Sequence, residues 1–251
     1  MKLNKLNKYY IVLAVILVIA SIYRKTAYKG GERYNYSITI TAPITFPIYV
    51  KEAYFLLPDG ELEGANIEST NNFNSAWGID YGSSNHASSA RLPSQFFLKY
   101  FSYRDKKFYS HKFELPQNEI LNIFKTADRN NQSLILSQFA GLKKGLSFVV
   151  GIANNGYVVV WLRGVFLEKE LLRAKLKSVE PKASDLDDEK NLTRDEYFKQ
   201  AFENLSDSLK MVYDKGFDDK ANYVDTPSRY IELNTELWEN QQKKGLIDFK
   251  K

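Results

Sequence analysis

The sequence predicts a single α+β domain, a mainly antiparallel sheet covered by two or three helices, preceded by an apolar N-terminal helix. Three observations support this class: an uncharged apolar run near the N-terminus, several short runs with the alternation or β-branched composition of strands, and later segments with helical spacing. The 251 residues are 44% hydrophobic and 14% aromatic, which is enough for one sizeable core. We expect residues 1–33 to form a leader and residues 34–251 to form one extracytoplasmic domain.

The run from Tyr9 to Tyr23 (YYIVLAVILVIASIY) follows a lysine-rich start and carries no charge. As a helix it reaches only ~22 Å, short of the ~30 Å hydrocarbon core, so a spanning helix needs interfacial tyrosines and snorkelling basic side chains at its ends. The run equally fits the core of a signal peptide cleaved after Ala20. Basic flanks and the lack of amphipathic spacing disfavour a buried core helix. Both favoured alternatives place the domain outside the cytoplasmic membrane of a bacterial cell: anchored in the inner membrane and facing the periplasm, or free in the periplasm.

The formal charge of +5 comes from the leader. Without the first 33 residues, 35 − 7 = 28 basic side chains face 30 − 1 = 29 acidic ones, so the domain is nearly neutral. Nucleic-acid binding needs a clustered positive surface, and we therefore expect no nucleic-acid partner. The chain has no cysteine, which excludes disulfides, thiolate metal ligands, a cysteine nucleophile and a thioether-linked lipid.

Strands are predicted by alternation and by turn residues. The first, at 34–41, alternates apolar and polar residues as a half-buried strand does, and the second, at 48–57, ends in the turn Pro58-Asp59-Gly60 before a hairpin partner. Further strands are expected at 94–103 and 108–113. The clearest hairpin is 147–163, where two β-branched runs flank Asn154-Asn155-Gly156, and its continuous apolar runs predict central strands buried on both faces.

Helices are predicted at 116–127, 193–215 and 235–244. Leu115-Pro116 opens the first, which should cap the sheet, and Thr193-Arg194-Asp195-Glu196 matches a capping box that begins the second, closed by Gly216. The third should bury Leu237 and Trp238. We expect these C-terminal helices to cover one side of the central hairpin. Residues 64–95 are interpreted as a long connection or a set of short irregular strands, and residues 168–190 as a charged segment.

No pattern identifies a catalytic, cofactor-binding or metal-binding residue. The two histidines, His86 and His111, have no carboxylate at a metal-ligand spacing, and no G-x-S-x-G elbow, Walker motif or dinucleotide fingerprint occurs. The acidic run 185–189 lacks the glycine and the spaced glutamate of a calcium loop, so a solvated linker is favoured. An envelope hydrolase acting on lipid or glycan stays an alternative, which would need His86 or His111 beside carboxylates.

A surplus of aromatic residues around the long connection and the turn at Arg104 is the one indication of binding. Trp77, Tyr81 and Tyr103, with Arg104, are the candidate partner-binding residues, because aromatic and arginine side chains commonly anchor protein contacts or stack on sugars. Aromatic residues in strands more often fill a core, and that alternative is the more frequent one. The expected function is therefore binding of a protein partner such as a toxin or an envelope component. A purely structural envelope protein is a third alternative.

An ordered series of short motifs runs from about Tyr34 to Trp238: Ala42-Pro43, Phe46-Pro47-Ile48-Tyr49-Val50, Pro58-Asp59-Gly60, Trp77-Gly78, Leu92-Pro93, Phe101-Ser102-Tyr103, Lys107-Phe108-Tyr109, Leu115-Pro116, Val149-Val150-Gly151, Val158 to Trp161 and Leu237-Trp238-Glu239. In this series the chain resembles the uncharacterised bacterial family of domain of unknown function twenty-nine thirty-one, many of whose members are labelled putative lipoproteins. The resemblance implies an envelope location and no assigned activity, and it raises an immunity role against toxins. Where lipoprotein members carry a cysteine after the apolar core, this chain has Ser21, which puts acylation in doubt and favours a retained helix or free release.

Overall fold

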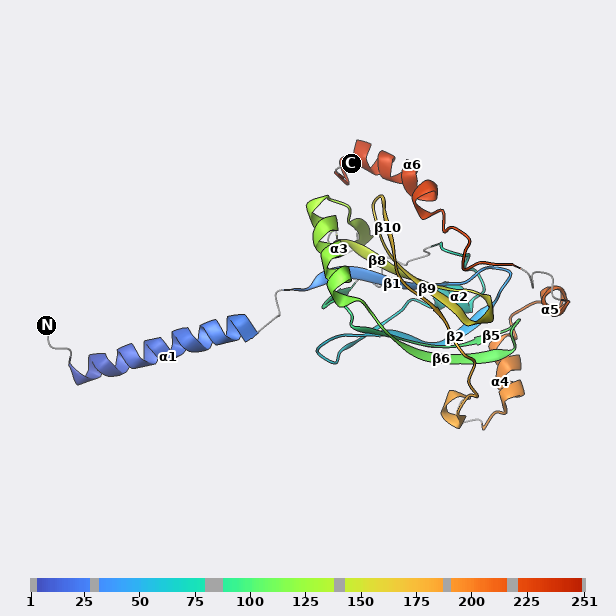
Figure 1. Cartoon of the computed structure of the whole chain (residues 1–251), viewed down its shortest axis with the longest axis horizontal. Coiled ribbons are helices and arrows are strands. Elements are labelled where there is room, and N and C mark those ends of the chain that lie inside the picture. Colours follow the sequence, from blue (N-terminus) through green and yellow to red (C-terminus); the bar gives the residue numbers. More distant parts are fainter. Residues whose placement is uncertain are drawn as a thin grey trace. The chain divides into compact units, whose positions relative to one another are not determined.

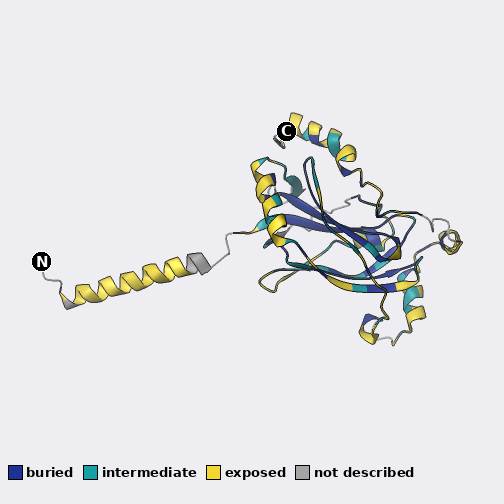
Figure 2. Cartoon of the chain, viewed as in Figure 1, coloured by how far each residue is buried: buried dark blue, intermediate teal, exposed yellow. Residues whose placement is uncertain are grey.

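The computed structural model describes residues 4–27, 32–79, 88–137, 143–186, 191–215 and 221–249. It divides into two compact units, Met1–Arg33 and Tyr34–Lys251 (Figure 1). In the first unit, the described residues form the helix α1 (Lys5–Ala27). Within α1 the window Leu6–Tyr23 has a mean hydropathy of 1.9 and no buried residue, so the helix is long and apolar enough to cross a membrane (Figure 2). The same properties fit a signal peptide.

Two sheets form the second unit. The six-stranded sheet has the order β10-β9-β8-β1-β4, with β7 also paired to β8, and the four-stranded sheet has the order β3-β2-β5-β6. Neighbouring strands run antiparallel except β1 and β8, which are parallel. The strands of the first sheet are β1 (Tyr34–Thr41), β4 (Ser88–Ala90), β7 (Leu134–Ser137), β8 (Lys143–Ile152), β9 (Tyr157–Gly164) and β10 (Leu167–Lys175). Those of the second are β2 (Ile48–Leu56), β3 (Leu62–Gly64), β5 (Gln95–Ser102) and β6 (Lys107–Glu114).

The main core lies between the two sheets. Phe55 of β2 contacts Phe96 of β5 and Phe148 of β8 edge to face, with ring centroids 5.1 Å and 4.9 Å apart. All three rings are fully buried, and edge-to-face contact is the arrangement that aromatic quadrupoles favour. The predicted class, one α+β domain with a mainly antiparallel sheet and an apolar N-terminal helix, is confirmed.

The predicted hairpin 147–163 is present as β8 and β9. Asn155 and Gly156 in its turn have φ of 58° and 77°, the left-handed conformation for which asparagine and glycine are suited. Every β8 residue from Gly145 onward is buried, as the continuous apolar run predicted. β1 differs from its prediction, because its polar face is buried too: Ser37, Thr39 and Thr41 are all covered.

The helix predicted at 116–127 is α3 (Gln117–Arg129), which closes the core with Ile120, Phe124 and Ala127. The capping box is also confirmed: Thr193 accepts the N–H of Glu196 at 3.3 Å, and Glu196 accepts the N–H of Thr193 at 2.8 Å. The predicted single helix over 193–215 is wrong. It is broken into α4 (Arg194–Ala201) and α5 (Asp207–Asp214), because Ser206 caps a new helix by accepting the N–H of Leu209. Gly216 lies outside the described residues.

The coverage predicted for the central hairpin also needs correction. Phe202 and Leu205, in the break between α4 and α5, and Tyr213 of α5 pack on the four-stranded sheet through Phe101 and Phe108. The outer face of β8 and β9 is covered by Trp77 and the segment around Val224 and, beside Arg163 and Gly164, by Tyr230 of the last helix, α6 (Tyr230–Lys243), so the prediction holds for α6 alone. This helix begins earlier than predicted; it buries Trp238 but leaves Leu237 52% exposed.

Charged and irregular segments were predicted least well. The charged segment 168–190, for which no strand was predicted, begins within β10. Residues 64–95, predicted as a long connection or a set of short irregular strands, contain α2 (Glu68–Asn71) and the short strand β4. Asp185, expected in a solvated acidic run, is buried and binds Lys99 at 2.6 Å; residues 187–190 of that run lie outside the described part.

Candidate functional site

The structure describes three of the four residues predicted to bind a partner. Trp77 is half-buried against Trp161, with ring centroids 5.3 Å apart, and its indole N–H donates to the carbonyl of Thr226 at 3.1 Å. Tyr103 is only 6% exposed and contacts Tyr213 in the core beside α4. Arg104 is half-buried, and Tyr81 lies outside the described residues.

These three residues belong to one continuous set of contacts. The Arg104 guanidinium lies over the ring of Tyr213, which also meets Tyr103. Arg104 donates to the carbonyl of Thr45 at 3.4 Å, and the Thr45 hydroxyl hydrogen-bonds the Tyr223 hydroxyl. The ring of Tyr223 in turn lies 6.3 Å from that of Trp77. Of the residues that link them, Tyr213 is buried, whereas Thr45 and Tyr223 are half-buried. Partner binding by this set stays a prediction.

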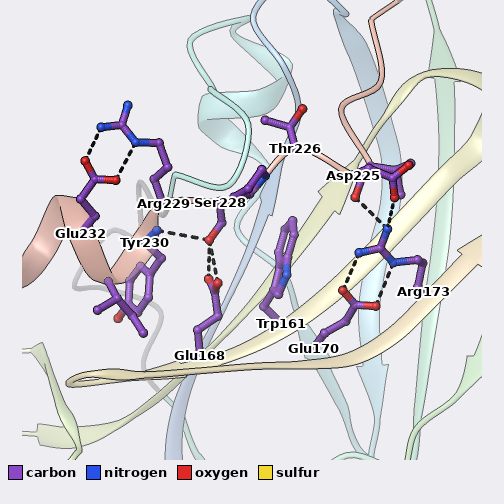
Figure 3. Close-up of a pocket in the computed structure, with 13 residues that line it drawn as sticks. Trp161, Glu168, Glu170, Arg173, Asp225, Thr226, Ser228, Arg229, Tyr230 and Glu232 are labelled. Carbon is purple, nitrogen blue, oxygen red and sulfur yellow. Dashed lines mark hydrogen bonds and ion pairs between the residues drawn. The ribbon is translucent and has the colours of Figure 1, made fainter.

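A groove of ≈ 340 Å³ lies next to Trp77. One wall comes from β9 and β10 (Trp161, Glu168, Glu170 and Arg173) and the other from residues 224–232; we call this the Trp161 groove. Figure 3 shows Trp161 standing between Glu168 and Glu170, with an arginine–carboxylate pair at each end. Thr226, Pro227 and Arg229 are exposed on the second wall.

The register of β9 and β10 builds the first wall. Arg163 pairs directly with Glu168, and Trp161 with Glu170, so all four side chains project from the same face of the hairpin. Val158, Val160 and Leu162 alternate with them and enter the core between the sheets. The local sequence VVVWLR therefore sends an apolar face inward and a tryptophan and an arginine outward.

Arg163 is fully buried behind the groove. Its guanidinium binds Glu168 at 2.7 Å, donates to the carbonyl of Gly78 at 2.7 Å, and stacks between the rings of Trp161 and Tyr230 at 5.0 Å and 4.5 Å. Because an uncompensated buried charge is very costly, the carboxylate and the two rings are what allow this arginine inside.

Ser228 completes this buried network. Its hydroxyl donates to Glu168 at 2.7 Å and accepts the N–H of Tyr230 at the first turn of α6. The pair Arg163–Glu168 thereby holds the C-terminal segment against the sheet. Arg229 next to Ser228 has φ of 55°, a left-handed conformation that costs a non-glycine residue of order 1 kcal/mol.

Exposed ion pairs at its two ends form the rim of the groove. Arg173 binds both oxygens of Glu170, at 2.9 Å and 2.7 Å, and also Asp225 at 2.8 Å. At the other end Arg229 binds both oxygens of Glu232, at 2.9 Å and 2.5 Å. Exposed pairs of this kind are worth ~0–1 kcal/mol, so a charged or hydrogen-bonding ligand can exchange with them at little cost.

The chemistry that these residues can perform is recognition through hydrogen bonds and charge. Ser228 lies beside a carboxylate, but that carboxylate already holds the Arg163 guanidinium. His111 is exposed on β6, in edge contact with Phe113, and His86 lies outside the described residues. Across the described ranges, no group of three His, Cys, Asp or Glu side chains is placed to hold a metal ion.

A second polar set lies where two hairpin turns meet. Asp105 accepts from the Tyr109 hydroxyl at 2.9 Å and from the N–H of Asn155 at 3.1 Å, and Tyr109 stacks on the buried Tyr100. Burial raises the pKa of Asp105 although both of these hydrogen bonds oppose the shift. The contacts join the β5–β6 turn to the β8–β9 turn, which is a structural role.

The groove residues were not among the sequence-based candidates. Arg163 has a signal in the sequence, because it is the one charged residue at the end of an apolar strand. Glu168 follows five positions later, so a tight turn at 164–167 would place the two residues opposite each other as a cross-strand pair. Ser228 and Arg229 carried no comparable signal, since only the tertiary fold brings the C-terminal segment to β10.

Fold and groove together define a two-sheet α+β domain with a ligand-sized surface groove, preceded by an apolar helix. The chain belongs to the family described as "Protein of unknown function (DUF2931)", which it matches over residues 22–217, and the resemblance seen in the sequence is thereby confirmed. The match ends before residues 224–232, the second wall of the Trp161 groove. No curated protein and no solved structure matches the chain.

Proposed function

We propose that the protein is a membrane-anchored binding protein of the bacterial cell envelope. In this proposal α1 holds the chain in the cytoplasmic membrane, and the unit Tyr34–Lys251 faces the periplasm and captures a partner without transforming it. The observation that carries the proposal is the window Leu6–Tyr23, apolar and wholly exposed within the structure. Exposing the apolar side chains of this window to water would be very unfavourable, so the window needs a lipid environment or removal after export.

The Trp161 groove is the binding site that we favour. Its ≈ 340 Å³ falls in the size range of small-ligand sites and suits one or two side chains of a protein partner. Its floor is an aromatic ring and its rim is made of exchangeable ion pairs, a combination common at the centres of protein interfaces. A toxin that the protein blocks and a component of the envelope are the two kinds of partner that we consider.

Site-specific photo-crosslinking in cells tests this proposal. A photoreactive amino acid in place of the exposed Thr226 should give one discrete adduct, whose identification by mass spectrometry names the partner. The same amino acid in place of the exposed Lys112 on β6 is the control and should not give that adduct. Charge reversal of Asp225 and Glu232 to Lys should abolish the adduct. No adduct at 226, or the same adducts at both positions, would contradict binding in the groove.

A further inference from the structure

Another pocket, of ≈ 310 Å³, lies between α6 and the six-stranded sheet, and Tyr230 belongs both to it and to the Trp161 groove. We call it the α6 pocket. Its lining includes Ser37 of β1, Ser147 of β8, residues 134–136 of β7, and Asn234, Trp238 and Gln241 of α6. None of the described residues that line it is charged, whereas ion pairs surround the Trp161 groove. The two pockets therefore suit different ligands.

Two buried serines bring hydroxyl groups to the sheet side of the α6 pocket. Ser37 and Ser147 lie opposite each other on the parallel β1–β8 ladder, and the Ser37 hydroxyl donates to that of Ser147 at 3.0 Å. A hydroxyl oxygen can accept two hydrogen bonds besides the one that it donates, so Ser37 keeps acceptor capacity for a ligand. Arg163, which faces Ser147 on β9, is bound by Glu168 and adds no unbalanced charge here.

Three side chains of α6 bring neutral donors and acceptors to the opposite wall. Asn234 donates through its side-chain nitrogen to the carbonyl of Tyr230 at 2.8 Å, which leaves its side-chain oxygen as an acceptor. Gln241 is half-buried, and within the described part of the chain its side-chain amide makes no hydrogen bond. The same holds for the indole N–H of Trp238, although this residue is only 2% exposed. A buried tryptophan N–H usually has a partner, so this donor indicates that a ligand completes the pocket.

We infer that the α6 pocket binds one neutral sugar ring that carries an N-acetyl group. A charged ligand would lose its hydration without meeting an opposite charge in the lining, and a wholly apolar ligand would leave the Trp238 N–H and the Gln241 amide unpaired. The hydroxyls of a sugar both donate and accept, as the serines and the amides on the two walls require. The acetamido group matches those amides, and its methyl group suits the apolar wall that β7 contributes.

The size of the pocket and the distribution of its polar groups favour a sugar over a peptide. The volume of ≈ 310 Å³ is at the lower end of the range of small-ligand sites, which suits a single ring. A peptide offers one N–H and one C=O per residue along a line, whereas a sugar ring presents several hydroxyls around its edge. The polar groups of the α6 pocket come from both walls, so the second arrangement matches it better. Sugar binding here goes beyond the proposed function and does not depend on the anchoring by α1.

Saturation-transfer difference NMR tests sugar binding on the full chain. The chain is held in nanodiscs of phosphatidylcholine, because detergents with sugar headgroups would compete. N-acetylglucosamine should give a saturable signal with a Kd on the order of 1 mM, and the signal should be strong at the acetyl methyl group. Glucuronate represents a charged ring and N-acetylalanine methylamide a peptide unit, and both should bind at least about tenfold more weakly. Empty nanodiscs correct for binding to lipid.

Two matched variants locate the binding. Gln241→Leu keeps the approximate size of the side chain but removes its amide, and should raise the Kd about tenfold. Gln242→Leu makes the same change at the next position of α6, which is exposed and does not line the pocket, and should leave the Kd unaltered. Ser37→Ala removes a hydroxyl from the other wall and should weaken binding likewise, so the test stays decisive if Gln241→Leu fails to fold.

Three results would overturn the inference: no saturable signal for N-acetylglucosamine, tighter binding of glucuronate or of the peptide unit, or equal Kd values for the two glutamine variants. Tri-N-acetylchitotriose identifies the source of the ring. Binding at least as tight as that of the monosaccharide would show that the pocket takes the end of a glycan, and weaker binding would show that it takes a free sugar.

Discussion

Arg163 and Glu168 face each other directly across the β9–β10 ladder, and one carboxylate oxygen of Glu168 lies 2.7 Å from both Nε and a terminal nitrogen of Arg163. The arginine side chain has no exposed surface, whereas that of Glu168 is 22% exposed. The same carboxylate accepts from Ser228, so one ion pair joins the sheet to the segment that forms the far wall of the Trp161 groove.

Glu168→Gln should destabilise the domain by about 3 kcal/mol, because it leaves the buried Arg163 guanidinium without a counter-charge. Glu170→Gln breaks a pair that is 37–40% exposed and should cost less than ~1 kcal/mol. Urea unfolding of the full chain in detergent measures both. The double replacement Arg163→Met with Glu168→Leu should recover part of the loss, because it removes both charges. Equal costs for the two single variants would show that Arg163 is not held by Glu168.

Tyr103→Ala should cost about 3–4 kcal/mol, since its ring packs against Phe198, Phe202 and Tyr213 with little exposed surface. Tyr103→Phe keeps those ring contacts and should cost far less. If Tyr103→Ala left thermal stability unchanged but weakened capture of the partner, Tyr103 would be a binding residue as the sequence predicted. Trp77 is half-buried beside the groove. We expect Trp77→Ala to impair capture of the partner and to reduce stability less than Tyr103→Ala does.

Gly145→Ala should disrupt the pairing of β1 with β8. A Cβ atom at position 145 would lie 1.9 Å from the backbone carbonyl oxygen of Asn35, a distance that only a shift of the main chain relieves. We expect a loss of at least about 2 kcal/mol in the free energy of unfolding. Gly64→Ala in β3 is the matched control, because nothing lies within 4 Å of its added methyl group. Similar unfolding midpoints for the two variants would contradict the parallel β1–β8 pairing.

The ion pair between Asp185 and Lys99 should make the stability of the domain depend on pH. Burial alone would raise the pKa of Asp185, but hydrogen bonds from Lys99 and from the N–H of Lys182 outweigh it, and the pKa falls below the ordinary carboxyl value. The folded state therefore binds a proton at Asp185 more weakly than the unfolded state does. The stabilisation from ionised Asp185 is fully present above the ordinary carboxyl pKa of ~4, and it is lost as the pH falls through the pKa of the folded state.

Asp185→Asn should thus cost about 2 kcal/mol at neutral pH and almost nothing at a pH below the folded pKa. Unfolding curves at neutral and strongly acidic pH measure the difference. Glu180→Gln, at a side chain that is 82% exposed, is the control and should show no such change. A cost for Asp185→Asn that does not vary with pH would contradict the pairing with Lys99.

Local patterns predicted the elements whose structure is decided locally. Asn154-Asn155-Gly156 predicted the central hairpin because its residue types accept positive φ, and Thr193 to Glu196 predicted the start of α4 because both capping hydrogen bonds lie within four residues. Apolar spacing likewise predicted α3, whose buried residues recur at helical intervals.

Elements decided by distant partners were missed. β10 was not predicted because its charged residues show no regular alternation with apolar ones. Glu168 and Glu170 fit a strand because β9 places Arg163 and Trp161 opposite them. The break after α4 has the same origin, since Phe202 and Leu205 turn into the core on Phe101 and Phe108. The groove needs residues 224–232 beside β10, a contact that no local pattern encodes.

The proposed function depends on which side of the membrane the domain lies. Lys2, Lys5 and Lys8 precede the uncharged run Tyr9–Tyr23, and Arg24, Lys25, Lys29 and Arg33 follow it. The numbers of basic residues on the two flanks therefore do not fix which end crosses. The location of the domain therefore has to be measured.

The most direct measurement fuses the C-terminus to two reporter enzymes in turn, one active only in the periplasm and one active only in the cytoplasm. A matched variant with Leu13→Lys and Val15→Lys places two charges in the apolar window and should abolish export, since each costs ~3 kcal/mol in a membrane. We predict activity of the periplasmic reporter alone for the native chain and of the cytoplasmic reporter alone for the charged variant. Activity of the cytoplasmic reporter alone for the native chain would contradict the account.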